Sequence, residues 1–135
     1  MKKLILCLTV IVIAVCSVAC NVVTDNVEGS DIAVITVSSD VLEITSTTTL
    51  LDYMNELKSK GKISFSMADG MITEINGKRA GGNVYWMLYT DDAELSNEAW
   101  GSCEYQQKTY LSAIYGVESL VVKEGATYVW HLQAF

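Results

Sequence analysis

An apolar run near the N-terminus decides how much of this chain is left to fold. Lys2 and Lys3 precede the apolar stretch from Leu4 to Ala19, and Cys20 follows it. Basic residues, an apolar stretch and small residues before a cleavage point are typical of a secretory signal peptide. A cysteine directly after that stretch is typical of a bacterial lipoprotein. We therefore expect cleavage before Cys20 and lipid attachment to its thiol.

Two other interpretations of this segment stay open: an uncleaved membrane anchor, and ordinary cleavage that leaves Cys20 with a free thiol. The stretch from Leu4 to Ala19 includes Thr9 and Ser17 and falls short of the roughly 20 apolar residues that span a bilayer. Ser17 also lies three positions before Cys20, where lipoprotein signals usually carry an aliphatic residue. The expected organisation is a signal over residues 1–19, a lipidated cysteine and tether over 20–30, and one domain over 31–135 in the cell envelope, outside the cytoplasmic membrane.

The size and charge of the mature chain limit the number of its domains and the classes of partner that it can bind. Removing 19 of the 135 residues leaves enough chain for one domain with a hydrophobic core and too little for two of ordinary size. All sixteen acidic residues but only seven of the nine basic ones lie beyond the signal, so the mature net charge is −9. A surface this acidic repels phosphate backbones, which excludes nucleic acid as a partner.

Beyond the tether, the pattern predicts a strand, a helix and a series of hairpins. Residues 32–37 are short and β-branched, as strands are. Hydroxyl side chains at 46–49 precede apolar residues spaced along one helical stripe, and Gly61 ends the helix. The pairs Asp69-Gly70 and Asn76-Gly77 are strong hairpin signals because they tolerate positive φ. The later strand-like runs are 63–67, 71–75, 84–89, 109–115 and 127–135.

Strict alternation in the run 84–89 separates two apolar faces, Val84, Trp86 and Leu88 on one and Tyr85, Met87 and Tyr89 on the other. The polar segment from Thr90 to Lys108 breaks this pattern, so we expect a functional loop or a short helix there. Its acidic residues Asp91, Asp92 and Glu94 are expected to form a solvated turn. One helix laid over a mixed sheet of four to five strands is an α+β fold of the β-grasp type.

The residue types give little sign of catalysis. Cys103 is the one cysteine of the exported domain, so no intrachain disulfide is expected and an incidental or buried thiol is the better interpretation. His131 is the only histidine and has no second donor at metal-ligand spacing. We therefore expect a protein that is not an enzyme, holds no metal and requires no cofactor.

Four segments of the chain carry a resemblance to a known family: Thr49-Leu50-Leu51, Met71-Ile72-Thr73-Glu74-Ile75-Asn76-Gly77, Tyr85-Trp86-Met87-Leu88 and Lys123-Glu124-Gly125-x-x-Tyr128-x-Trp130. In order and spacing they resemble the transcobalamin-like C-terminal domain family, which includes a domain of the cobalamin carriers and many bacterial surface lipoproteins. The resemblance runs from Ile32 to Phe135. It implies a soluble-ligand-binding β-grasp fold.

The resemblance also implies a ligand and its contacts. In the carriers, an aromatic-Trp-Gln-Leu segment and a Leu-Leu-Gln-Gly-Ile segment contact the corrin. The first corresponds to residues 85–88, with Met87 in place of the glutamine, and the second to residues 110–114, which include Leu111 and Ser112. Cobalamin or a related tetrapyrrole is the implied ligand. Because the carriers close a large helical domain over it, a second cobalamin-binding or transport subunit is among the implied partners.

Aromatic residues outside the expected core add further candidates. Tyr85, Tyr89 and Trp100 are expected to contact a ligand or partner, whereas Trp86 and Trp130 are expected to belong to the core. The first hypothesis is a lipid-anchored module that binds a small planar ligand. The alternative is a module that recognises a surface protein or the cell wall and binds no small molecule. The candidate ligand-binding residues are Tyr85, Trp86, Met87, Leu88, Tyr89, Trp100, Leu111 and Ser112.

Overall fold

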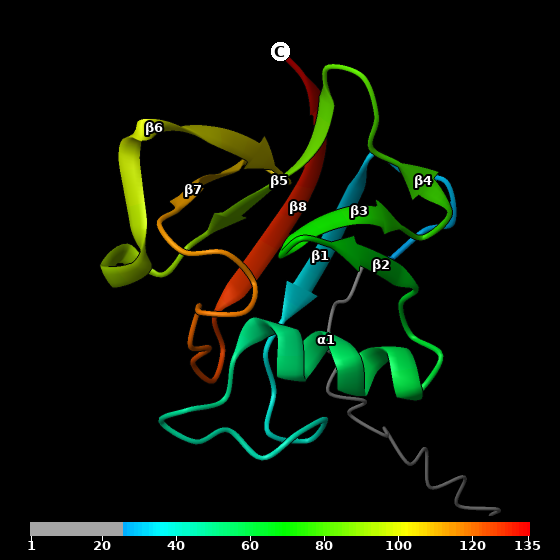
Figure 1. Ribbon diagram of the computed structural model, residues 1–135. Coiled ribbons are helices and arrows are strands. Elements are labelled where there is room, and N and C mark those ends of the chain that lie inside the picture. The colour runs from blue at the N-terminus through cyan, green and yellow to red at the C-terminus, as the bar shows by residue number, and fades with distance from the viewer. Residues whose placement is uncertain (1–25) are drawn as a thin grey trace, which may run out of the picture.

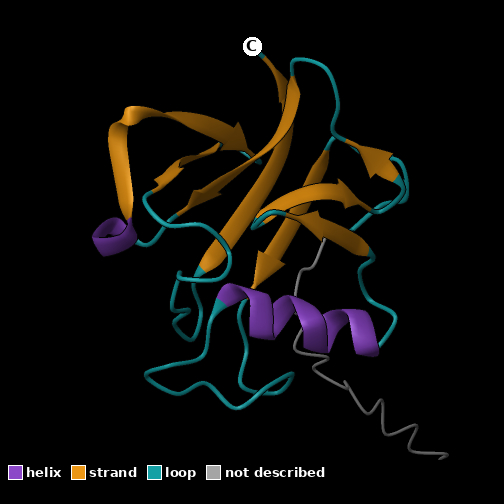
Figure 2. Cartoon of the chain, in the orientation of Figure 1, coloured by secondary structure: helices purple, strands orange, loops and turns teal. Residues whose placement is uncertain are grey.

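The computed structural model describes residues 26–135, so the expected signal, Cys20 and the first part of the tether lie outside the described residues. Figure 1 and Figure 2 show one helix and two β-sheets, an α+β arrangement. The elements are β1 (Ile32–Thr36), α1 (Leu50–Ser59), β2 (Phe65–Ala68), β3 (Met71–Ile75), β4 (Lys78–Arg79), β5 (Val84–Thr90), the 3-10 helix η1 (Ala93–Leu95), β6 (Ser96–Tyr105), β7 (Lys108–Ala113) and β8 (Thr127–Ala134). Within residues 26–135, no helix is both long and apolar enough to cross a membrane.

The two sheets are antiparallel throughout the described chain. The larger has the strand order β1-β8-β5-β7-β6, and the smaller has the order β2-β3-β4. The larger sheet has five strands, within the expected four to five, but the expectation that it is mixed is wrong. The reason lies in the connection through α1, which leads from β1 into the separate smaller sheet and not back to a parallel neighbour. The strand beside β1 is the last one, β8, which runs in the opposite direction.

Helix α1 begins and ends where the sequence pattern places it. Thr49 is the N-cap: its hydroxyl accepts from the Asp52 amide at 3.2 Å, and the Asp52 carboxylate accepts from the Thr49 amide at 2.9 Å. This capping box satisfies two amides that the first turn leaves unpaired. Beyond the last turn, Gly61 has a φ of +69°, which only glycine adopts without strain. The buried helix residues are Leu50, Tyr53, Met54 and Leu57.

Both predicted hairpin turns are confirmed. Asp69 and Gly70 have φ of +51° and +76°, and Asn76 and Gly77 have φ of +47° and +79°. Two consecutive positive φ values are what a tight turn with the twist of its flanking strands requires. The first turn joins β2 to β3 and the second joins β3 to β4. Together they build the smaller sheet, which lies beside α1 in Figure 1.

The larger sheet buries both of its faces. Trp86, Leu88, Tyr128 and Trp130 belong to the main core with α1 and the smaller sheet, which confirms the expected core position of the two indoles. A second core, on the other face, is built from one residue of each strand. Its members are Val34, Val129, Tyr89, Tyr110 and Cys103. Tyr89 was expected to lie outside the core as a ligand or partner contact, and its position outside the core is wrong, since only 5% of it is exposed.

The segment between Thr90 and Lys108 contains a short helix, η1, which was one of its two expected forms. Most of the segment, however, is β6, a ten-residue strand that pairs with β7 at the edge of the larger sheet and was not expected. The pairing is interrupted between Asn97 and Ser102, where the extra residues bulge away from the ladder. The β6–β7 turn uses Gln106 and Gln107 at φ of +48° and +64°, in place of the usual Asn-Gly. Because β6 is a polar edge strand with a bulge and an atypical turn, its sequence has almost no alternating pattern from which a strand could be predicted.

Candidate functional site

A cavity of about 260 Å³ lies between the larger sheet and the tip of the β2–β3 hairpin. The hairpin contributes residues 70–72, β5 contributes 86–88, β8 contributes Trp130, and β7 with the loop after it contributes 112–117. Figure 1 shows how these parts meet: the β2–β3 tip reaches toward β8 and β5, and the loop after β7 passes close by. Four separate segments of the chain therefore build one site.

Two indole rings form part of its wall. Trp86 and Trp130 are 5% and 4% exposed, and Trp130 pairs with Leu88 across the β5–β8 ladder. The Nε1–H of Trp86 donates to the Lys78 carbonyl oxygen at 3.0 Å, which fixes the orientation of that ring. The Nε1–H of Trp130 is buried and has no acceptor among the described residues. One wall is thus rigid and satisfied, and the other carries an unused donor.

The rim of the cavity is apolar and open to solvent. Met71 on the hairpin is 55% exposed, and Tyr115 in the loop after β7 is 50% exposed. No charged side chain belongs to the described lining. Flat apolar walls with few polar groups favour a planar, uncharged ligand, because nothing there would compensate a charge taken out of water.

The structure brings half of the sequence-predicted site residues to this cavity. Trp86, Met87, Leu88 and Ser112 line it. Ser112 pairs with Tyr89 across the β5–β7 ladder, so strand alternation turns its side chain toward the second core. The part of Ser112 that borders the cavity is therefore mainly its backbone.

The other four predicted residues lie elsewhere. Tyr85 is 41% exposed, and its ring packs against that of Phe135 with the centroids 6.2 Å apart. Tyr89 is in the second core, where its hydroxyl donates to the side-chain oxygen of Gln133. Trp100 is 61% exposed on the bulged part of β6, and Leu111 pairs with Thr90 and Ser102 in the sheet. None of the four lines the cavity.

Sequence reasoning missed three parts of the wall: Met71, the loop over residues 114–117, and Trp130 as a cavity residue. Strand alternation did assign both Trp86 and Trp130 to the inner face of the sheet, and in the structure Trp130 pairs with Leu88, two residues from Trp86. The contributions of Met71 and Tyr115 depend on how the hairpin tip and the loop fold over the sheet. No local pattern in the sequence specifies that approach.

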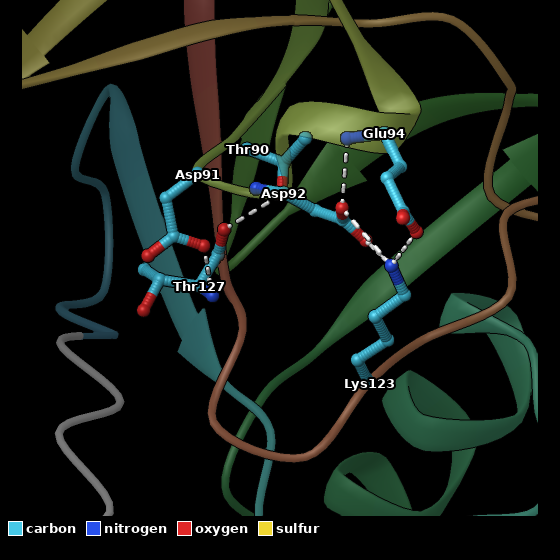
Figure 3. A network of polar contacts seen from close by, with 6 residues as sticks. All are labelled: Thr90, Asp91, Asp92, Glu94, Lys123 and Thr127. Atoms are coloured by element: carbon cyan, nitrogen blue, oxygen red, sulfur yellow. Dashed lines mark hydrogen bonds and ion pairs between the residues drawn. The ribbon is translucent and has the colours of Figure 1, made fainter.

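Of the acidic turn, Glu94 is solvated as expected, whereas Asp92 is buried and Asp91 is only partly exposed; all three belong to a polar network, drawn in part in Figure 3. The Asp91 carboxylate accepts from the Thr127 amide at 2.9 Å and pairs with Lys108 at 2.8 Å. Asp92 is only 8% exposed and caps η1 by accepting from the Glu94 amide at 3.0 Å. These bonds fasten the end of β5 to the start of β8.

Lys123 completes that network. Its ammonium lies 3.3 Å from the Asp92 carboxylate and also donates to Glu94. Hydrogen bonding to Lys123 lowers the pKa of Glu94, and the same bond raises the pKa of Lys123. Within residues 26–135, no group of three or more histidine, cysteine or acidic side chains is arranged to hold a metal ion. In this network two lysines pair with three carboxylates, and Lys123 is shared by Asp92 and Glu94.

Cys103 offers little nucleophilic reactivity. It is buried in the second core, and burial raises the pKa of its thiol to about 11. The thiolate is the reactive form of cysteine, so this side chain stays protonated near neutral pH. The expectation of a buried cysteine is confirmed.

Comparisons with protein-family models, curated proteins and solved structures gave no match to this chain. The resemblance to the transcobalamin-like family is therefore carried by the sequence segments alone.

Proposed function

We propose that this protein is a lipid-anchored module of the cell envelope that binds a small planar ligand in the cavity beside β5. The observation that carries this proposal is an apolar cavity walled by Trp86 and Trp130, open at Met71 and Tyr115, with no charged side chain in its lining. Binding there buries aromatic ligand surface against rigid rings, which lose little conformational entropy. The proposal needs no catalytic residue and no resident cofactor.

The size of the cavity limits the ligand. A volume of about 260 Å³ lies just under the roughly 300–1,000 Å³ typical of sites for drug-sized molecules. It suits one or two fused rings that stay open to solvent on one side, at the rim. Cobalamin or a related tetrapyrrole would insert one edge and rest the remainder on the open rim of Met71 and Tyr115. A second subunit that covers this exposed part of a large ligand fits the same proposal.

The unused donor of Trp130 narrows the chemistry further. A buried N–H without an acceptor destabilises a protein by about 1–3 kcal/mol. The Trp130 nitrogen has less than 1 Å² of accessible surface, so a carbonyl or ring nitrogen on a ligand recovers part of this only if binding moves the cavity wall enough to reach it. The preferred ligand is therefore neutral, flat and equipped with a hydrogen-bond acceptor.

We also propose that this protein is related to the transcobalamin-like family and therefore has a β-grasp ancestry. Two observations support it: one helix packs on a sheet, and Trp86 and Leu88, which the resemblance implied as ligand contacts, line the cavity. The antiparallel pairing of β1 with β8 marks a difference from the mixed sheet that the resemblance suggested.

Calorimetric titration of the mature protein tests the proposal. The ligands are indole and lumichrome as small neutral rings, and cobalamin and haem as tetrapyrroles. We expect saturable binding that Trp130→Phe weakens for acceptor-bearing ligands and that Trp100→Ala leaves unchanged. Equal loss of binding in both variants, or no binding of any of the four compounds, would overturn the proposal.

The alternative function, recognition of a surface protein or the cell wall, is favoured by one separate observation. Strand β6 is one of the two edge strands of the larger sheet, and it presents Trp100 at 61% exposure. Edge strands add a partner's strand through main-chain hydrogen bonds, and an exposed indole supplies specificity. Loss of adhesion to cell-envelope preparations in Trp100→Ala, with ligand binding absent, would select this function.

A further inference from the structure

The segment that leads toward Cys20 leaves the domain at a defined place. The Gly29 amide donates to the Asn76 carbonyl oxygen at 2.7 Å, and the Asn76 side-chain amide donates to the Asn26 side-chain oxygen at 3.2 Å. The Glu28 carboxylate lies so close to Gly77 that a Cβ there would meet its oxygen at 2.2 Å. Residues 26–30 are therefore fastened to the β3–β4 turn. Cys20 lies six residues before Asn26, a reach of at most about 20 Å.

Most of the basic residues of the described chain gather around this exit. Lys58 and Lys62 share a surface depression with Asn26, Glu28 and Asn76. Three more basic residues lie close by: Lys60 at the end of α1, and Lys78 and Arg79 on β4, just after the β3–β4 turn. We call this surface the basic face; it consists of Lys58, Lys60, Lys62, Lys78 and Arg79. In Figure 1 the end of α1, the start of β2 and β4 all lie on one side of the molecule.

The cations of the basic face are only partly neutralised. Lys62 has no ion-pair partner among the described residues, and Lys58 donates only to the Phe65 carbonyl oxygen, at 3.1 Å. Arg79 pairs with Glu74 but its side chain is 82% exposed. The acidic residues beside the face are four: Glu28, Asp31, Glu56 and Glu74. The face therefore has about one positive charge in excess.

The rest of the described chain is strongly acidic. It carries eleven acidic residues and two basic ones, and those two, Lys108 and Lys123, are held by the carboxylates of the network in Figure 3. The rest of the described chain thus has a net charge of −9, in contrast to the basic face. An anionic surface repels the acidic part and attracts the face from which the tether emerges.

We propose that the basic face lies against anionic lipid headgroups when the protein is anchored at Cys20, and that β6 with the acidic network points away from the membrane. The short tether keeps the face within reach of the membrane's surface potential, whose range is about 10 Å at 0.1 M salt. The attraction of one basic side chain to such a surface raises the ratio of molecules with that side chain at the membrane to molecules with it away from the membrane about fivefold. This inference rests on the expected anchor and not on the ligand cavity.

The test supplies the anchor chemically, so that it does not depend on lipidation in the cell. The mature protein is coupled through Cys20 to a maleimide lipid in vesicles of phosphatidylcholine, with or without one part in three of phosphatidylglycerol. Cys103 does not compete, since it is buried and its thiol pKa is about 11. Acylation of each lysine by an amine-reactive reagent is then followed by mass spectrometry.

On the anionic vesicles we expect Lys58 and Lys62 to react about fivefold more slowly than on the neutral ones, with Lys108 and Lys123 unchanged. The difference should shrink in 1 M salt. The variant Lys60→Gln/Lys62→Gln should lose the protection at Lys58, whereas the control Gln106→Glu/Gln107→Glu, with the same change in net charge at exposed positions of the β6–β7 turn, should keep it. Equal reactivity on both lipids, or equal loss of protection in both variants, would refute the proposal.

Discussion

Replacing Trp86 with alanine tests whether this ring is at once a core residue and a wall of the cavity. Trp86 is 5% exposed and packs in the main core, so its removal loses buried apolar area and leaves a void. Such truncations destabilise a protein by about 3–5 kcal/mol. Because one side of the ring already borders a cavity of about 260 Å³, fewer contacts are lost than at a fully enclosed site. We expect the lower end, about 3 kcal/mol.

The hydrogen bond of the Trp86 indole to the Lys78 carbonyl oxygen is part of that loss. A typical intramolecular hydrogen bond contributes about 1 kcal/mol, so Trp86→Phe should lose about that amount plus a smaller packing term. For a domain of this size, about 3 kcal/mol lowers the midpoint of thermal unfolding by about 12 °C or more.

Urea unfolding followed by circular dichroism measures both variants against Trp100→Ala. The control removes an equally large ring that is 61% exposed, and we expect a change within about 0.5 kcal/mol. A loss of less than about 1 kcal/mol in Trp86→Ala, or an equal loss in the control, would show that Trp86 does not pack as described.

Three further predictions concern stability and titration. Burial raises the pKa of Cys103 from its ordinary value near 9 to about 11 and that of Tyr128 from 10 to about 12, so the stability that their protonated forms contribute is present below pH 9 and is lost as the pH rises toward 12. Urea midpoints should therefore stay level from pH 7 to about pH 9 and fall from there to pH 11, and a profile that stays flat up to pH 11 would contradict this. Asp92→Ala should destabilise the domain by about 1–2 kcal/mol because the η1 cap is lost, and Asp92→Asn, which keeps an acceptor, should lose less; equal losses would argue against the cap. Thr49→Ala should destabilise the domain by about 1 kcal/mol and Thr49→Ser by much less, both measured by urea unfolding, and no difference between them would contradict the capping box.

Local signals in the sequence predicted the elements that follow local rules. The capping box at Thr49, the glycine after α1 and the two turns with consecutive positive φ each depend on a few neighbouring residues. Strand alternation placed Trp86 and Trp130 in the main core for the same reason, since the period of two needs no knowledge of the partner strand.

Features that depend on distant pairing were missed. The direction of β8 beside β1 is set by the route of the chain through a second sheet, which no local pattern records. Tyr89 is buried because the other strands of the larger sheet add side chains to its face, and the sequence of β5 alone cannot show this. The partners of Asp91 and Asp92 include Lys108, Lys123 and Thr127, and only the fold brings them together.

The candidate site divides in the same way. The strand residues at 86–88 were predicted because the resemblance implied that residues 85–88 contact the ligand. The hairpin tip with Met71 and the loop with Tyr115 close the cavity from elsewhere in the chain. Trp100 was predicted to contact a ligand or partner because it lies outside the expected core. It is exposed, but it lies on β6 outside the cavity.

The most direct test of the proposed function uses the three tryptophan side chains as separate reporters. In a ¹⁵N–¹H correlation spectrum the indole N–H groups of Trp86, Trp100 and Trp130 give three resonances, which single substitutions assign. During titration with a neutral planar ligand that carries an acceptor, we expect the Trp130 resonance to move most, Trp86 to move less and Trp100 to stay in place. Movement of Trp100 alone, or of none of the three at saturating ligand, would contradict a ligand site in this cavity.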